Sequence, residues 1–139
     1  MDKIASAMLS MIVIASTPNT IEYKANHSNE LTNDIVIELS VEDKIRIKAD
    51  EYGLNQELML RIADAESQFR SVPNYKYTDE NGRYTAFGIF QITRTTWKTY
   101  CDEDNTLEQR SNIDKNIECA MIIASESGVH HWNESKNNW

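Results

Sequence analysis

Apolar residues recur at helical spacing in several stretches from residue 40 onwards. The first predicted helix starts at a capping box formed by Ser40 and Asp43, and it ends at Gly53. Its apolar face carries Val41, Ile45, Ala49 and Tyr52. A second helix is predicted from about Gln56.

The apolar face of this second helix is interrupted by a carboxylate. Leu58, Ile62 and Glu66 are spaced by four residues, which places Glu66 over the face that packs into the core. Burial there disfavours the charged form and raises the pKa of the carboxyl group. A carboxyl group that keeps its proton near neutral pH can protonate the leaving oxygen of a glycosidic bond. The alternative is a glutamate at the helix end that turns to water or caps the helix.

Extended segments follow the second helix. Residues 74–78 and 83–87 carry aromatic and β-branched side chains around the turn-prone sequence DENG. This pattern predicts a small β-hairpin.

Two more helices are predicted after the hairpin. Thr93 caps a short helix that continues to Cys101, and Ser111 with Asp114 caps a longer helix that Gly128 ends. The apolar stripe of the longer helix is formed by Ile113, Ile117, Met121 and Ala124. Helices therefore dominate a predicted α+β fold, which forms one globular domain over residues 40–139.

The first 39 residues lie outside this pattern. A lysine, an apolar run from Ile4 to Ala15 and then small residues predict a secretory signal peptide over residues 1–15. The run is too short for a membrane span, which needs roughly 20 residues; the alternatives are an uncleaved anchor and a buried N-terminal helix. Residues 16–39 are mostly polar, with a short IVIEL, and predict a lead-in or linker.

The composition of the chain limits the classes of molecule that it is expected to bind. The chain has 139 residues, 40% of them hydrophobic, and a formal net charge of −8 without a basic cluster. This charge argues against nucleic acid and against anionic membranes as partners, because both attract clustered lysine and arginine. The three histidines and the spacing of the acidic residues predict no metal site, and no cofactor is expected.

The two cysteines are Cys101 and Cys119. In an exported protein we expect them to form a disulfide, which would stabilise the fold by roughly 3 kcal/mol in the chain-entropy model. Two buried free thiols are the alternative.

AESQF is followed, 22 residues after its glutamate, by the glycine of AFGIFQITRTTW. Together these two motifs resemble the lysozyme-like superfamily, and more narrowly the soluble lytic transglycosylase domains. The matching residues are Glu66, Ser67, Gly88, Ile89, Phe90, Gln91 and Ile92. Asn116 and Ile117 match an Asn-Ile pair at the start of a later helix in that family. The resemblance implies a mainly helical lysozyme-like domain with a small β-hairpin beside the active-site cleft.

Several residues are candidates for binding a glycan. Gly88 lets the backbone approach a sugar ring, and the amide of Gln91 can bind an N-acetyl or hydroxyl group. Tyr75, Tyr77, Tyr84 and Phe87 either stack on sugars or pack across the hairpin. The predicted substrate-binding set is Ser67, Tyr84, Phe87, Gly88, Ile89, Gln91 and Asn116.

Most glycosidases use a second carboxylate. Two positions where relatives carry an aspartate hold Ala86 and Thr93 here. The remaining candidates, Asp79 and Glu80, lie in the predicted hairpin turn, where acidic residues are common for turn chemistry alone.

The resemblance implies cleavage of the β-1,4 bond between N-acetylmuramic acid and N-acetylglucosamine in peptidoglycan. In lytic transglycosylases one glutamate acts as acid and then as base, here Glu66, while the muramic acid 6-hydroxyl attacks its own anomeric carbon. The alternatives are a hydrolytic muramidase that uses Asp79 or Glu80, and a non-catalytic glycan-binding or inhibitory module. We expect a monomer, without a membrane span after signal cleavage, that is secreted or located in the periplasm or cell envelope.

Overall fold

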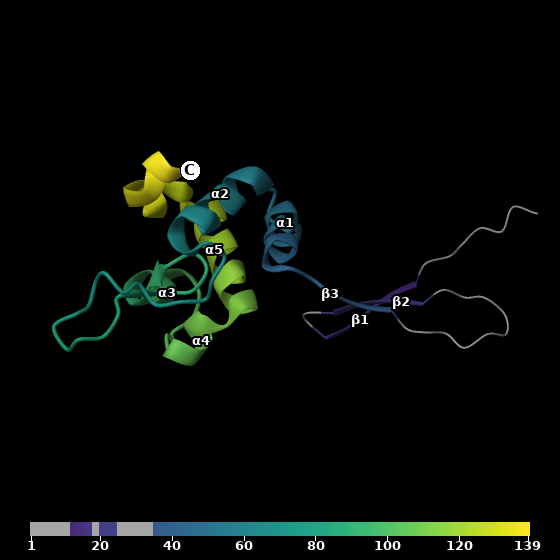
Figure 1. Ribbon diagram of the computed structural model, residues 1–139, viewed down its shortest axis with the longest axis horizontal. Helices are drawn as coiled ribbons and strands as arrows, with labels where there is room; N and C mark the ends of the chain where they lie inside the picture. The colour runs from purple at the N-terminus through teal and green to yellow at the C-terminus, as the bar shows by residue number, and fades with distance from the viewer. Residues whose placement is uncertain (1–11, 18–19, 25–34) are drawn as a thin grey trace, which may run out of the picture. The chain divides into compact units, whose positions relative to one another are not determined.

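The structure is a computed structural model that describes residues 12–17, 20–24 and 35–139. The chain forms two compact units, Met1–Leu39 and Ser40–Trp139 (Figure 1).

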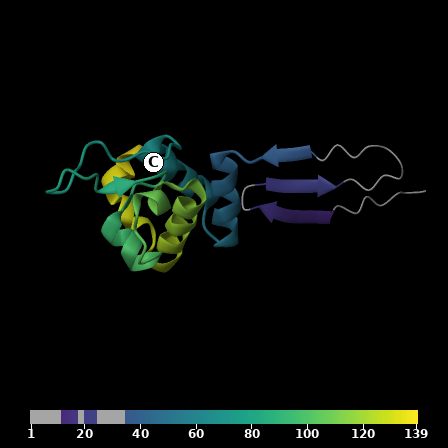
Figure 2. The same ribbon diagram turned by 90° about the horizontal axis from the view of Figure 1, so that it is seen from below.

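The second unit is mainly helical. Its helices are α1 (Val41–Glu51), α2 (Gln56–Ser67), α3 (Arg94–Tyr100), α4 (Leu107–Ser111), α5 (Ile113–Ser127) and the 3-10 helix η1 (Val129–Asn138). Strands β4 (Ala86–Phe87) and β5 (Ile92–Thr93) form a small antiparallel sheet. The helices gather into one bundle, and the loop between α2 and β4 extends away from it in both views (Figures 1 and 2). The predicted α+β class, with helices dominant, is confirmed.

The core of this unit forms where the apolar helix faces meet. Its fully buried side chains include Ile45, Ala49, Met59, Ile62, Ala63, Ile89, Phe90, Ile117, Met121 and Ile123. Removing these surfaces from water is the main contribution to stability. The loop residues Ile89 and Phe90 belong to this core, so the second motif is anchored by packing.

The helix caps agree with the sequence at two of the three predicted sites. Ser40 and Asp43 form the predicted capping box of α1, and the side chain of Thr93 caps α3. The third prediction was wrong, because Ser111 is the last residue of α4. Asn112 instead caps α5, with its side-chain oxygen accepting a hydrogen bond from the Lys115 N–H at 3.0 Å. Its extended backbone separates the two helices.

The predicted hairpin is present only in part. Its arms pair at isolated positions, Pro73 with Phe87 and Thr78 with Tyr84. The end of the second arm, strand β4, pairs forward with β5, because the chain turns back through residues 88–91. The regular sheet therefore lies around the second motif.

The first unit contains an antiparallel sheet of three strands in the order β1-β2-β3, formed by β1 (Ile12–Thr17), β2 (Thr20–Lys24) and β3 (Ile35–Glu38). This sheet differs from the expected polar lead-in over residues 16–39. Its strands are rich in β-branched residues, which favour extended backbone. Residues 1–11 of the predicted signal peptide lie outside the described residues, so the signal peptide stays a prediction. In the described ranges no helix has the length and apolarity to cross a bilayer.

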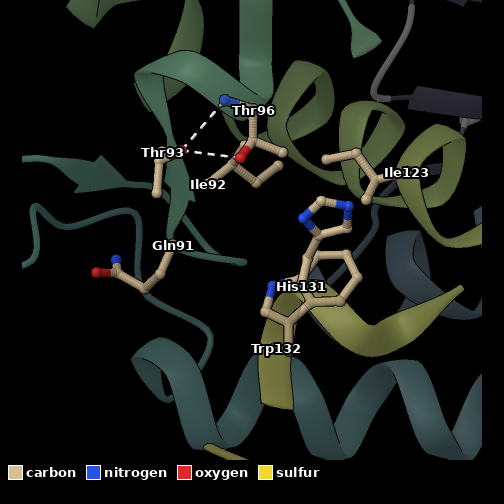
Figure 3. A pocket seen from close by; sticks show the side chains of 7 residues that line it. All are labelled: Gln91, Ile92, Thr93, Thr96, Ile123, His131 and Trp132. Carbon is tan, nitrogen blue, oxygen red and sulfur yellow. Dashed lines mark hydrogen bonds between the residues drawn. The ribbon is translucent and has the colours of Figure 1, made fainter. Parts of the chain in front are cut away.

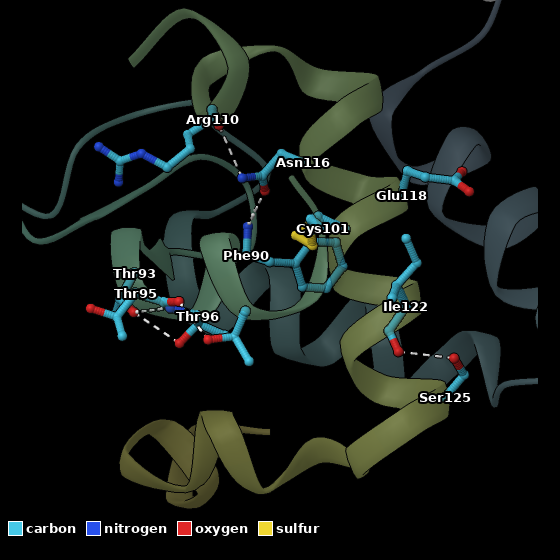
Figure 4. Close-up of a disulfide and its surroundings, with 12 residues drawn as sticks. Phe90, Thr93, Thr95, Thr96, Cys101, Arg110, Asn116, Glu118, Ile122 and Ser125 are labelled. Carbon is cyan, nitrogen blue, oxygen red and sulfur yellow. Dashed lines mark hydrogen bonds between the residues drawn. A yellow bond between two sulfur atoms is a disulfide. The ribbon is translucent and has the colours of Figure 1, made fainter. Parts of the chain in front are cut away.

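The predicted disulfide is confirmed. Cys101 and Cys119 are bonded, with their Cα atoms 5.5 Å apart. The bond joins the end of α3 to the middle of α5 (Figure 4). It therefore links the helix that follows the second motif to the central helix of the core.

Candidate active site

Glu66 lies in the last turn of α2, partly buried, immediately before the helix ends. The next residues leave the helix through left-handed backbone, with φ of 55° at Gln68 and 60° at Phe69. Positive φ is unfavourable for residues other than glycine, and such strain is often found at functional sites. The third such residue of the described chain is Gln91, with φ of 48°, in the second motif. All three strained residues thus belong to the two motifs that predicted the site.

The surroundings of Glu66 favour its protonated form. Burial raises the pKa of its carboxyl group above the ordinary value near 4.5. The hydroxyl of Ser135 lowers the pKa by hydrogen bonding, and the negative charge of Glu134 raises it. The net effect is an increase, as the position of Glu66 on the apolar face of α2 predicts.

Ser67 connects Glu66 to the second motif. Its side chain is buried, and its hydroxyl donates a hydrogen bond to the carbonyl of Ile89 at 2.8 Å. The same oxygen accepts a hydrogen bond from the backbone N–H of Arg70 at 3.2 Å. Ser67 and Ile89 were predicted to contact substrate, but both are buried because they join the end of α2 to the loop. Ser67 thereby fixes where the loop stands relative to Glu66.

Position 88 requires a glycine because the side chain of Asn116 lies close to the backbone there. Its φ is +88°, and a Cβ at this position would lie 2.1 Å from Nδ2 of Asn116 and 2.8 Å from the carbonyl oxygen of Arg110. The expected reason for this glycine was the approach of a sugar ring. The structure gives a different reason, which is packing of the loop backbone against Asn116.

Asn116 holds the loop from inside the core. It is fully buried, and its Oδ1 accepts a hydrogen bond from the Phe90 N–H at 2.9 Å. Its Nδ2 donates to the carbonyl oxygens of Phe87 at 3.2 Å and Arg110 at 3.0 Å. Figure 4 shows the bonds of Asn116 to Phe90 and Arg110. Asn116 therefore supports the loop, with its amide bonded on both sides, and its contact with substrate stays a prediction.

Gln91 also supports the loop with one side of its amide. Its Nε2 donates to the carbonyl oxygens of Val72 and Gly88, both at 2.8 Å. The amide points away from His131 and Trp132 in the close view (Figure 3). Gln91 also borders a shallow pocket that is lined in addition by Ile92, Thr93, Thr96, Ile123, His131 and Trp132. Contact between its remaining oxygen and a substrate stays a prediction.

The aromatic residues of the hairpin keep much of their surface in water. The rings of Tyr75 and Tyr84 meet edge to face, with centroids 5.3 Å apart, yet remain 70% and 40% exposed. Phe87 is partly buried at the start of the second motif. Both readings of these residues, stacking on sugars and cross-strand packing, are therefore compatible with their positions.

Asp79 is bonded within the hairpin turn. Its Oδ1 accepts hydrogen bonds from the backbone N–H groups of Asn81 and Arg83, both at 2.9 Å, and its Oδ2 accepts from the Arg83 Nε at 3.0 Å. Donation by the Arg83 backbone is the largest cause that lowers the pKa of Asp79. Glu80 lies beside it, exposed. Turn chemistry thus accounts for Asp79, and a catalytic role for either residue stays a prediction.

The sequence reasoning missed the residues of η1 that affect the pKa of Glu66. The C-terminal segment was expected either to close the cleft or to seal the core. Trp132 is buried and donates from its indole N–H to the Phe90 carbonyl at 2.8 Å, which seals the core beside the second motif. The same segment carries Ser135, which lowers the pKa of Glu66, and Glu134, which raises it. In the sequence, the one feature that points to Glu134 and Ser135 is that they follow Trp132 near the end of a helical pattern.

The part of the chain that the structure describes contains no group of three or more His, Cys, Asp or Glu side chains arranged to hold a metal ion. The arrangement around Glu66 is instead one partly buried carboxyl group beside a loop fixed by Ser67, Gly88 and Asn116. Such a group can give a proton to a bound substrate and take one back.

Comparisons with known proteins identify the family of this chain. The family described as transglycosylase SLT domain matches residues 43–136. Alpha-lactalbumin from Oryctolagus cuniculus is 34% identical over 68 residues, which cover 41% of this chain and 47% of that protein. The chain thus spans about half the length of this curated relative. No solved structure matches. Because the family match covers more than half of the chain and includes both motifs, the chain belongs to the transglycosylase SLT domain family.

Proposed function

We propose that this domain cleaves the β-1,4 bond between N-acetylmuramic acid and N-acetylglucosamine in the glycan strands of peptidoglycan by lytic transglycosylation. The observation that carries the proposal is the partly buried carboxyl group of Glu66 at the end of α2, whose pKa is raised by burial. It stands beside a loop that Ser67 ties to the same helix end. The family match supports the class of substrate.

In this proposal Glu66 acts twice. The neutral carboxyl group first protonates the glycosidic oxygen as the bond to the muramic acid anomeric carbon breaks. The muramic acid 6-hydroxyl then attacks that carbon, and the Glu66 carboxylate takes the proton of the hydroxyl. The product carries a 1,6-anhydro ring, water is not consumed, and Glu66 ends the cycle protonated again.

The state of Asp79 favours this one-carboxylate reaction over hydrolysis with a second carboxylate. Three hydrogen bonds hold Asp79 within its turn, so both of its carboxylate oxygens are already engaged there. Tyr84, Phe87 and the free oxygen of Gln91 are the proposed glycan contacts. The disulfide between Cys101 and Cys119 supports an oxidising location outside the cytoplasm, where peptidoglycan is found.

The test is digestion of purified peptidoglycan with the protein and its Glu66→Gln variant, followed by mass spectrometry of the released muropeptides. We expect anhydro products from the unmodified protein and none from Glu66→Gln. Glu80→Gln is the matched control, because it removes an exposed carboxylate in the turn, and it should leave cleavage unchanged. Products heavier by one water would indicate a hydrolytic muramidase, and equal activity of the Glu66→Gln variant would contradict the role of Glu66. The absence of any product from the unmodified protein, with glycan still bound, would indicate a binding module.

A further inference from the structure

A pocket beside the second motif is lined by residues of that motif and of η1. Figure 3 shows the side chains of Thr93 and Thr96 on one side and those of His131 and Trp132 on the other. The remaining lining residues are Gln91, Ile92 and Ile123. The two isoleucines and the tryptophan are buried, whereas the other lining residues keep part of their surface in water. The pocket thus combines buried apolar surface with accessible polar groups, as sites that bind small molecules do.

His131 is the one lining residue that can change its charge near neutral pH. Its imidazole ring packs on three other rings. The Tyr100 ring meets it edge to face with centroids 5.4 Å apart, and the centroids of the His130 and Trp132 rings lie 4.3 Å and 6.4 Å away. These contacts hold the imidazole in the wall of the pocket, while the residue stays exposed to solvent. A ligand in the pocket would therefore cover this ring.

The surroundings of His131 favour its neutral form. Burial lowers the pKa of the imidazole below its ordinary value of 6.5, and the charge of His130 lowers it further. Tyr100 is the other titratable residue that packs on the ring, and within the described residues no further charged group contributes to the shift. His131 is therefore neutral at neutral pH and becomes a cation in acid.

We propose that His131 is a glycan-binding residue that contacts an uncharged sugar unit, and that the sugar binds more tightly while the imidazole is neutral. The proposal rests on the proposed function, in which the glycan strand lies along the second motif. A sugar that covers the imidazole removes water from it and supplies no negative charge in return. Removing water from a cation costs free energy, whereas a neutral imidazole can exchange hydrogen bonds with water for hydrogen bonds with sugar hydroxyls. Protonation of His131 therefore weakens glycan binding.

The direction of the pH effect follows from linkage. A glycan that prefers the neutral imidazole must lower the pKa of His131 when it binds. Glycan affinity is then at its full value above the pKa of the free protein, and it falls as the pH drops through that pKa, which lies below 6.5. A decrease of one pKa unit on binding corresponds to a loss of about tenfold in affinity. Contact with a carboxylate of muramic acid or of its peptide would have the opposite sign, with affinity rising in acid.

The first experiment measures the pKa of His131 by nuclear magnetic resonance, with and without bound sugar. The probe is the trisaccharide of N-acetylglucosamine, which carries no titrating group, and the protein is Glu66→Gln, in which position 66 does not titrate. The imidazole signals are followed between about pH 5 and 8. We expect the pKa of His131 to fall by about one unit in the bound protein. An unchanged or a raised pKa would overturn the proposal.

Matched variants of the two adjacent histidines test whether the effect belongs to His131. Each is introduced into Glu66→Gln, and trisaccharide affinity is measured by calorimetry across the same pH range. His131→Phe keeps an aromatic ring that takes up no proton, so its affinity should be the same in acid as at neutral pH. His130→Phe removes the neighbouring charge, so the loss of affinity should begin at higher pH. Acid weakening that persists in His131→Phe, or that disappears in His130→Phe, would refute the assignment.

Cleavage kinetics separate this proposal from the proposed function. Because kcat/KM reports the pKa values of the free protein, its acid limb should follow His131 and vanish in His131→Phe, while kcat in acid stays the same. Cleavage with an identical acid limb in both proteins would remove the role of His131 and leave the proposed function standing. A pKa of His131 that falls on binding of the trisaccharide, without anhydro products from peptidoglycan, would support the binding role and contradict the proposed function.

Discussion

Replacement of Asn116 by alanine should cost about 3 kcal/mol of unfolding free energy. The side chain makes three hydrogen bonds, to the Phe90 N–H and to the carbonyl oxygens of Phe87 and Arg110. At about 1 kcal/mol for each bond, their loss is a large share of the 5–15 kcal/mol that stabilises a typical domain. The Phe90 N–H would also be left buried without an acceptor.

Urea denaturation under oxidising conditions measures this cost, with tryptophan fluorescence as the signal. Asn112→Ala is the matched control, because it removes one exposed helix cap and should cost about 1 kcal/mol. An Asn116→Ala variant no less stable than Asn112→Ala would refute the view that Asn116 anchors the loop. Gly88→Ala should also be destabilising, since its Cβ would lie 2.1 Å from Asn116 Nδ2. The cost of the double variant should be less than the sum of the two single costs.

Other predictions concern charge and cross-linking. Arg110→Met should stabilise the domain by about 1 kcal/mol or more in urea, because Arg110 is buried and its Nη1 has no partner in the described part of the chain; a loss of stability would mean that the guanidinium is paired in solution. Reduction of the Cys101–Cys119 bond should cost about 3 kcal/mol on the same assay, and an unchanged midpoint would contradict this. The raised pKa of Glu66 means that the folded state holds this proton more tightly than the unfolded state, so unfolding free energy should fall as pH rises above about 4.5. Glu66→Gln should remove that fall; a parallel pH dependence in both proteins would contradict it.

The helices could be predicted because their signals are local. The capping box at Ser40 and Asp43 and the cap at Thr93 each depend on residues three positions apart, and the structure shows both. The cap of α5 was misplaced by one residue, because Ser111 and Asn112 are both good capping residues. Because the short helix α4 includes Ser111 as its last residue, Asn112 is the residue left to cap α5.

The supporting contacts of the site could not be predicted because they join residues far apart in the chain. Gly88 meets Asn116, and Trp132 meets Phe90 across 42 positions. Nothing local in the sequence specifies these pairs. The raised pKa of Glu66 was predictable from its place on an apolar face, whereas the effects of Ser135 and Glu134 on that pKa come from η1, whose contact with α2 no local pattern specifies.

The strands of the first unit were missed for a different reason. β-branched residues in Ile12–Thr17 and Thr20–Lys24 are typical of strands, but the apolar run up to Ala15 was assigned to a signal peptide and residues 16–39 to a polar lead-in. A signal peptide and strand β1 share the apolar residues Ile12–Ala15, and pairing between strands is not visible in any one strand alone.

Digestion of peptidoglycan in water enriched in heavy oxygen tests the central claim most directly. Intramolecular attack by the 6-hydroxyl uses no water, so the new muramic ends should be anhydro and free of heavy oxygen. The same experiment with Glu66→Gln should yield no product, whereas Glu80→Gln should match the unmodified protein. Heavy oxygen in the new reducing ends, or anhydro products from Glu66→Gln, would contradict the account in which Glu66 alone acts as acid and base.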